Sequence, residues 1–303
     1  MRIVLVGTVE GSGIAFDSLL EAGYPPSLIV TLPPEAASRH SDFADLTTPA
    51  RRLGIGVHHT TNINAAETID ALAATDPDLM LVLGWSQICR QPFREIAGLG
   101  TVGFHPAALP RLRGRGVIPW TILRNEATAG STLFWLDDGV DSGDILLQRI
   151  FAVDAQETAR SLYDKHTRNM REMVPEAVGL VAAGKAPRLA QDESQASYCA
   201  KRTPADGLID WQQPAAAILR LVRAVGDPYP GAFTLQDGEK IGVDAAVAFA
   251  EPGRFIGLVG QVQAHTERGF AVLCGDEGCI EVTKWHSASG RRPRVHSKLQ
   301  CGV

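Results

Sequence analysis

The stretch that decides the fold runs from Gly103 to Asp144 and reads GFHPAALPRLRGRGVIPWTILRNEATAGSTLFWLDDGVDSGD. It opens with the end of a short apolar run, which predicts a buried strand that carries His105 at its end. Pro106 follows and cannot donate to a β-ladder, so the strand stops there. Ligands of open α/β sheets bind beyond the carboxyl ends of the strands. The stretch therefore predicts a functional site that contains His105.

The second half of this stretch predicts another strand, over 130–136, followed by a polar acidic loop over 137–144. A histidine and a carboxylate presented by two such loops can form a pair. In such a pair the carboxylate fixes the imidazole tautomer and stabilises its cation. Taken alone, the residues fit equally well a hydrogen-bonded loop histidine and a solvated acidic turn.

Between these halves lies a loop, 109–116, that combines three arginines with two glycines and has neither helical nor strand periodicity. Guanidinium groups bind carboxylates and phosphates through paired hydrogen bonds. The loop therefore favours an anionic or polar substrate.

The segments HPAALPRLRGRG, PWTIL and GSTLFWLDDGVDSGDILLQ together resemble the signature of the folate-dependent formyltransferases. That family combines an Asn-x-His motif with a distant aspartate in a D-[ST]-G-[DGP] loop. The resemblance implies that His105 and Asp141 are catalytic. The asparagine position is held by Gly103, which has no side chain to hold the oxyanion of a tetrahedral intermediate.

This resemblance also implies a reaction, the transfer of a formyl group from 10-formyltetrahydrofolate to an amine or hydroxylamine of a small molecule. A nucleotide-linked amino sugar and a hydroxyornithine-like precursor both fit as acceptors. The backbone of two loops would hold the pterin ring of the donor, and the arginine loop would bind the acceptor. The residues implied for the donor are Gln87, Ile88, Cys89, Asp137, Asp138, Gly139 and Val140; those for the acceptor are Arg113, Gly114 and Arg115.

Apolar runs and helical patterns alternate through the first part of the chain and predict an α/β, Rossmann-like, mostly parallel sheet flanked by helices. The Pro-rich piece 33–49 reads as an exposed loop. Short glycine-punctuated strands after residue 232, among them 239–243 and 245–250, predict a small OB-like β-barrel. We expect a catalytic domain over 1–188, a polar linker over 189–205 and the barrel domain over 206–303.

The composition of the sequence indicates where the protein is located and whether it binds a metal. The sequence has neither an apolar run long enough to span a membrane nor a signal-like leader, which predicts a cytoplasmic protein without membrane partners. The five cysteines are scattered, which favours neither disulfides nor zinc. His58 and His59 are adjacent, and on a strand they would point to opposite faces. We therefore expect no metal; a homo-oligomer is compatible with the sequence.

Two alternatives to a small-molecule formyltransferase stay open. One is a methionyl-tRNA formyltransferase, but the net charge is −5, and from Asp206 onward ten Lys and Arg residues face eleven Asp and Glu residues. This balance disfavours a nucleic-acid partner. The exception is the cluster Arg291, Arg292, Arg294 and Lys298. The other alternative is a non-catalytic folate-binding relative that has lost the asparagine.

Overall fold

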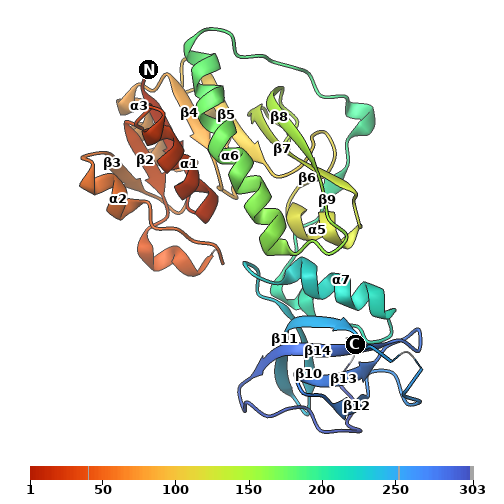
Figure 1. Cartoon of the computed structure of the whole chain (residues 1–303). Helices are drawn as coiled ribbons and strands as arrows, with labels where there is room; N and C mark the ends of the chain where they lie inside the picture. Colours follow the sequence, from red (N-terminus) through yellow and green to blue (C-terminus); the bar gives the residue numbers. More distant parts are fainter. Residues whose placement is uncertain (40, 252, 301–303) are drawn as a thin grey trace. The chain divides into compact units, whose positions relative to one another are not determined.

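The structure is a computed structural model and describes residues 1–39, 41–251 and 253–300 (Figure 1). The chain folds into two compact units, each with its own sheet. The first unit comprises Met1–Val117, Thr128–Ala152 and Tyr163–Ala200, and the second comprises Ile118–Ala127, Val153–Leu162 and Lys201–Val303. No helix in the described part of the chain is long and apolar enough to cross a bilayer.

The first unit is built on a seven-stranded sheet in the order β3-β2-β1-β4-β5-β7-β8. The strands from β3 to β5 are parallel, whereas β7 is antiparallel to both β5 and β8. This mixed sheet confirms the Rossmann-like prediction. The strands are β1 (Ile3–Val6), β2 (Leu28–Thr31), β3 (Gly56–His59), β4 (Leu79–Val82), β5 (Gly100–His105), β7 (Thr128–Trp135) and β8 (Ile145–Ala152).

Helices cover both faces of this sheet because alternate strand residues point to opposite sides. Ile3 and Leu5 of β1 join one buried cluster with α1 (Glu10–Glu21), α2 (Thr47–Arg52) and α6 (Ala159–Ala182). On the other face, Val4 and Val6 join a second cluster with α3 (Ala66–Thr75) and α4 (Gln91–Arg94). Burial on both faces explains why the central strands are continuous apolar runs.

The second unit contains a five-stranded antiparallel sheet in the order β10-β11-β14-β13-β12. Isolated bridges join Leu235 to Gln300 and Gln261 to Lys298, so the segment 298–300 links the two edges of the sheet. This linkage confirms a small barrel-like domain. Its elements are η3 (Pro204–Gly207), α7 (Ala215–Val225), β10 (Ala232–Gln236), β11 (Glu239–Ala248), β12 (Val262–His265), β13 (Phe270–Leu273) and β14 (Cys279–Ser287).

The structure differs from the sequence-based expectations in two segments. The piece 33–49 is not simply an exposed loop, because it contains η1 (Pro34–Arg39) and the start of α2, and Leu46 is 2% exposed. Residues 239–248 form one strand, with an irregular register near Val243, where two strands were predicted.

The polar connector after α6 is ordered and pairs with the arginine loop. It contains η2 (Glu193–Gln195) and β9 (Tyr198–Cys199), and β9 pairs in parallel with β6 (Arg113–Gly114). The short helix α5 (Val117–Leu123) follows β6. Residues 189–200 thus belong to the first unit and lie against the loop that follows His105.

Candidate active site

His105 is the last residue of β5 and is 4% exposed. Its Nε2 lies 2.7 Å from the carbonyl oxygen of Leu112, and its Nδ1 lies 3.4 Å from Oδ2 of Asp141. A carbonyl oxygen only accepts hydrogen bonds, so Nε2 carries a proton. When the ring carries a second proton, on Nδ1, His105 can form an imidazolium–carboxylate pair with Asp141.

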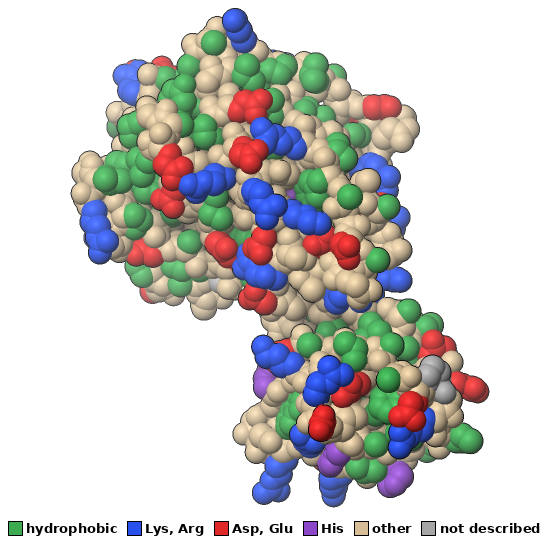
Figure 2. Space-filling model, in the orientation of Figure 1, with side chains coloured by type: hydrophobic (Ala, Val, Ile, Leu, Met, Phe, Trp, Pro, Cys, Tyr) green, Lys and Arg blue, Asp and Glu red, His purple; other side chains and the backbone are tan. Residues whose placement is uncertain are grey.

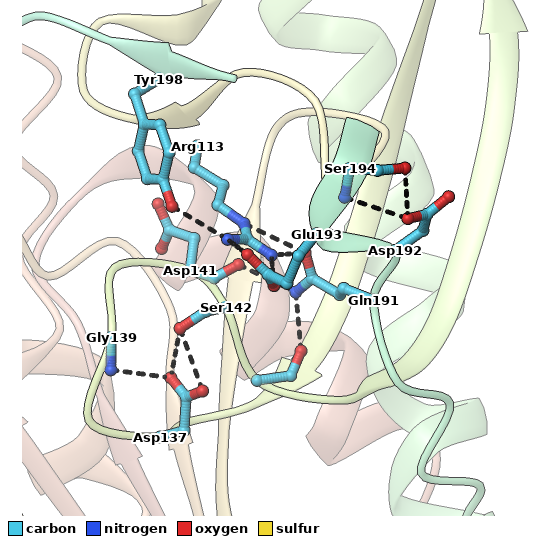
Figure 3. A network of polar contacts seen from close by, with 11 residues as sticks. Arg113, Asp137, Gly139, Asp141, Ser142, Gln191, Asp192, Glu193, Ser194 and Tyr198 are labelled. Atoms are coloured by element: carbon cyan, nitrogen blue, oxygen red, sulfur yellow. Dashed lines mark hydrogen bonds and ion pairs between the residues drawn. The ribbon is translucent and has the colours of Figure 1, made fainter. Parts of the chain in front are cut away.

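Asp141 reaches His105 through a loop that reverses direction after β7. Trp135, at the end of this antiparallel strand, pairs with Val102 and not with His105. Gly143 permits the reversal, because a Cβ atom there would lie 1.7 Å from the Trp135 carbonyl oxygen. The Asp137 carboxylate closes the loop by accepting hydrogen bonds from the Ser142 hydroxyl and the Gly139 N–H (Figure 3).

Both residues that contact the His105 ring have a left-handed backbone. The φ angle is 52° at Asp141 and 58° at Leu112. Aspartate tolerates this conformation, but for leucine it costs on the order of 1–3 kcal/mol and persists only where the surroundings hold it. Here the Leu112 N–H donates to the Ser197 hydroxyl at 2.9 Å, and the Gly114 N–H donates to Oδ2 of Asp141 at 2.7 Å.

The loop over Gln87, Ile88 and Cys89, which is predicted to bind the formyl donor, is held to the segment 61–63 by side-chain hydrogen bonds. The Gln87 amide accepts from the Ile63 N–H and donates to the Thr61 carbonyl, each at 2.8 Å. Ile88 is 62% exposed, whereas Cys89 is buried. Burial raises the pKa of the Cys89 thiol to about 12, so this side chain stays neutral. The loop therefore offers backbone groups and an apolar side chain.

Arg94 connects this loop to the second predicted donor loop. It lies in α4, directly after the 87–90 segment, and its guanidinium donates to the Asp137 carbonyl and to the Asp138 carboxylate. Val140, in the same loop as Asp138, is 43% exposed. The two loops are thereby brought together, each with an exposed apolar side chain.

Gly103 lies in β5, two residues before His105, and is closely packed. A Cβ atom there would lie 2.7 Å from Leu136 Cδ2 and 3.1 Å from the Phe134 ring. The side chains of Phe134 and Leu136 therefore fill the space next to Gly103.

The three residues predicted to bind the formyl acceptor differ in their burial and contacts. Arg113 is completely buried, and its guanidinium bonds to Gln191, Glu193 and Tyr198 (Figure 3). The hydrogen bonds between Glu193 and Arg113 raise the pKa of Arg113 and lower that of Glu193. Gly114 faces Asp141 through its N–H, and Arg115 is exposed. Arg113 is thus buried and its charge is already paired within the protein, whereas the side chain of Arg115 is exposed.

The adjacent histidines of β3 bond to two different helices. His58 contacts the Thr68 hydroxyl of α3 at 3.1 Å, and His59 contacts the Thr47 hydroxyl of α2 at 2.8 Å. Within residues 1–39, 41–251 and 253–300, no group of three potential ligands is placed to hold a metal ion. Four cysteines in this part of the chain are free thiols, and Cys301 lies outside it.

The fold and the paired His105 and Asp141 define a class, α/β proteins with a histidine–carboxylate pair beyond a strand end. Two family models match the chain: Formyl transferase over residues 32–178, and Formyl transferase, C-terminal domain, over residues 201–300. The chain belongs to the formyltransferase family and is a formyltransferase.

Several known proteins are similar to this chain. A methionyl-tRNA formyltransferase of Halorhodospira halophila is 36% identical over 298 residues, which cover 96% of this chain and 93% of that protein. The fold matches WlaRD, a sugar 3N-formyltransferase solved with dTDP and 5-N-formyl-THF, with a TM-score of 0.67, 19% identity and coverage of 92% and 96%. It also matches HypX from Aquifex aeolicus, solved with tetrahydrofolic acid, with a TM-score of 0.68, 20% identity and coverage of 95% and 44%.

Two residues of this region were not found by reasoning from the sequence. Arg94 sits in an ordinary amphipathic segment, and Gln191 lies in a polar stretch typical of a linker. Each bonds to a loop about fifty residues away along the chain. A bond between such distant segments leaves no signal in local composition or periodicity.

Proposed function

We propose that this protein transfers the formyl group of 10-formyltetrahydrofolate to an amine or hydroxylamine of a small molecule, and that His105 and Asp141 carry the reaction. The observation that supports this most strongly is the 3.4 Å contact between His105 Nδ1 and Asp141 Oδ2. In the reaction, the neutral acceptor nitrogen attacks the formyl carbon and forms a tetrahedral intermediate. The bond to N10 of the folate then breaks, and the proton that the acceptor nitrogen loses is passed to N10.

The donor's pterin ring would lie between the loops over 87–89 and 137–140. Exposed Ile88 and Val140 suit a flat heteroaromatic ring, and the carboxylates of Asp137 and Asp138 are occupied by Ser142 and Arg94. Backbone groups of these loops are therefore the natural partners of the ring's polar edge.

His105 would act on the developing charge of the intermediate. With a proton shared with Asp141, its ring can stabilise an oxyanion or relay the proton released by the acceptor nitrogen. A further oxyanion donor is worth about 2.7–4 kcal/mol. Gly103 cannot supply it, and the packing of Phe134 beside Gly103 leaves no room for an asparagine there without rearrangement.

The charge of the second unit supports a small-molecule acceptor. Arg294 pairs with Asp237 at 2.7 Å, Arg268 pairs with Glu281 at 2.5 Å, and Arg292 donates to the Thr266 carbonyl. On the face drawn in Figure 2, basic and acidic side chains are interspersed. A surface that binds RNA phosphates needs a continuous basic patch. Exposed Arg115 would bind an anionic part of the acceptor.

A methionyl-tRNA formyltransferase is the second candidate, because the 36% identical relative carries that name. The deciding experiment offers the purified enzyme 10-formyltetrahydrofolate with three acceptors: a nucleotide-linked amino sugar, N-hydroxyornithine and methionyl-tRNA. We expect formylation of a small molecule. Efficient formylation of methionyl-tRNA alone would reject our proposal in favour of the second candidate. Failure with all three acceptors would reject both candidate functions as stated.

A further inference from the structure

The Arg113 guanidinium has used all of its hydrogen-bonding capacity. It has five N–H donors. They meet Gln191 Oε1 at 3.2 and 2.8 Å, the two Glu193 carboxylate oxygens at 2.9 and 2.6 Å, and the Tyr198 hydroxyl at 3.0 Å. Since all three partners belong to the segment 191–198, Arg113 fixes this segment against β6 (Figure 3).

Gln191 continues this network toward the aspartate loop. Its Nε2 donates to the Asp141 carbonyl at 2.9 Å and to the Gly143 carbonyl at 2.7 Å. Arg113 can only donate and the two carbonyls can only accept, so the orientation of the Gln191 amide is determined by its partners. Both amide hydrogens and both lone pairs of Oε1 are engaged.

Backbone bonds hold the same three segments in register. The Arg113 N–H donates to the Ser197 carbonyl at 2.8 Å, and the next N–H, that of Gly114, donates to Oδ2 of Asp141. Leu112, whose carbonyl accepts from His105, donates its own N–H to the Ser197 hydroxyl. The segment 191–199 is therefore in contact with both loops that touch the His105 ring.

From these contacts we propose that Gln191 is a positioning residue that holds the backbone of Asp141 so that its carboxylate faces His105, with Arg113 fixing the Gln191 amide. The inference rests on the proposed function of the His105–Asp141 pair. Gln191 touches neither ring nitrogen; it acts by bonding the carbonyls on both sides of Ser142, where the backbone is left-handed at Asp141. Without these bonds, the backbone on both sides of Ser142 loses two hydrogen bonds that hold its left-handed turn, and the carboxylate moves from His105.

The test compares Gln191→Glu and Gln191→Met with the control Gln195→Glu. The glutamate variant keeps an acceptor for Arg113 but loses both amide donors, and the methionine variant removes the polar group altogether. Gln195 is exposed in the same segment, so its variant carries the same charge change. We expect both Gln191 variants to lower kcat about 10–100-fold with a nearly unchanged donor KM, because small displacements of catalytic groups are costly. The control should stay within about twofold of wild type.

A second comparison separates positioning from a general structural role. In an Asp141→Asn background, Gln191→Met should lower kcat by less than about twofold, because residues that act as a unit are not additive. All rates are taken well below the lowest Tm of the set. An undiminished loss in this background, or near wild-type kcat in both single variants, would overturn the proposal.

NMR of the histidine rings needs no turnover and tests the positioning role of Gln191 separately from the proposed function. The eight histidines are labelled with ¹⁵N, and the His105 ring signals are assigned with His105→Gln. Gln191→Met should shift the His105 ring signals toward those of Asp141→Asn, while the signals of His58 and His59 stay unchanged. If the His105 ring signals of Gln191→Met match those of wild type, the positioning role is wrong even where formyl transfer is observed. If wild type transfers no formyl group, only the proposed function fails.

Discussion

Nδ1 of His105 lies 3.4 Å from Oδ2 of Asp141, although β7, the strand before the Asp141 loop, runs antiparallel to β5 and ends beside Val102. The loop must therefore turn back toward His105, and left-handed Asp141, tightly packed Gly143 and the Asp137–Ser142 bonds make this turn. Three structural features within eight residues therefore position the Asp141 carboxylate. Such local constraint is expected for a carboxylate that takes part in the reaction.

His105→Gln should lower kcat about 10²–10⁴-fold, because a glutamine cannot carry the proton that a general acid or base transfers. Turnover at saturating donor and acceptor is the measurement, with Tm as the folding control. Glutamine can still donate to the Leu112 carbonyl, so folding should be preserved. Near wild-type turnover in a folded variant would remove His105 from the reaction.

Substitution of Arg115 should weaken acceptor binding, whereas substitution of Arg113 should lower stability. Arg115→Ala should raise the acceptor KM about 10–100-fold, because a charge-assisted hydrogen bond is worth about 1.5–3 kcal/mol, and should leave Tm unchanged. Arg113→Lys should instead lower stability by about 1.5–3 kcal/mol, since an ammonium offers three donors to a site that uses five. An acceptor KM that depends on Arg113 but not on Arg115 would reverse these assignments.

Gly103→Asn should reduce both stability and turnover. The new Cβ would meet Leu136 at 2.7 Å and the Phe134 ring at 3.1 Å, and overpacking of this kind costs about 1–3 kcal/mol. Gly103→Ala, which adds only the Cβ atom, should show a smaller loss. The measurements are Tm and kcat/KM with the true acceptor. A clear gain in kcat/KM over wild type would mean that the site is a weakened form of the asparagine-containing one.

The Arg113–Glu193 pair should make stability depend on acid pH. Because the hydrogen bond from Arg113 lowers the pKa of Glu193 below 4.5 in the folded protein, its stabilising effect is complete above 4.5 and is lost as pH falls through the lower, folded-state value. The Tm difference between wild type and Glu193→Gln should be constant near neutral pH and shrink below pH 4.5. A difference that grows toward acid pH would contradict this sign.

The strands and their sheet could be predicted because their cause is local. Ile3–Val6 and Leu79–Val82 are continuous apolar runs, as strands covered on both faces must be. The short helix from Thr47 could not be predicted in the same way, because Ala50 is buried against a sheet that the local sequence does not reveal.

Some residues of the site could likewise be predicted from local motifs, whereas the roles of others depend on partners far along the chain. His105 and Asp141 stand in recognisable motifs, and the structure brings them together as the resemblance implied. The role of Arg113 could not be predicted, because its partners Gln191 and Glu193 lie 78 and 80 residues later in the chain. An arginine in a glycine-containing loop resembles a ligand-binding residue until the side chains that bind its guanidinium are known.

The measurement that tests the central claim most directly is a single-turnover assay of formyl transfer by wild type and Asp141→Asn, with enzyme in excess over 10-formyltetrahydrofolate. Asparagine keeps the size of the side chain and can still accept from the Gly114 N–H, but it cannot share a proton with His105 or stabilise its cation. We predict a formylated product from wild type and a rate at least about 100-fold lower from Asp141→Asn, at equal Tm. Equal rates from the two enzymes would contradict a reaction carried by the His105–Asp141 pair.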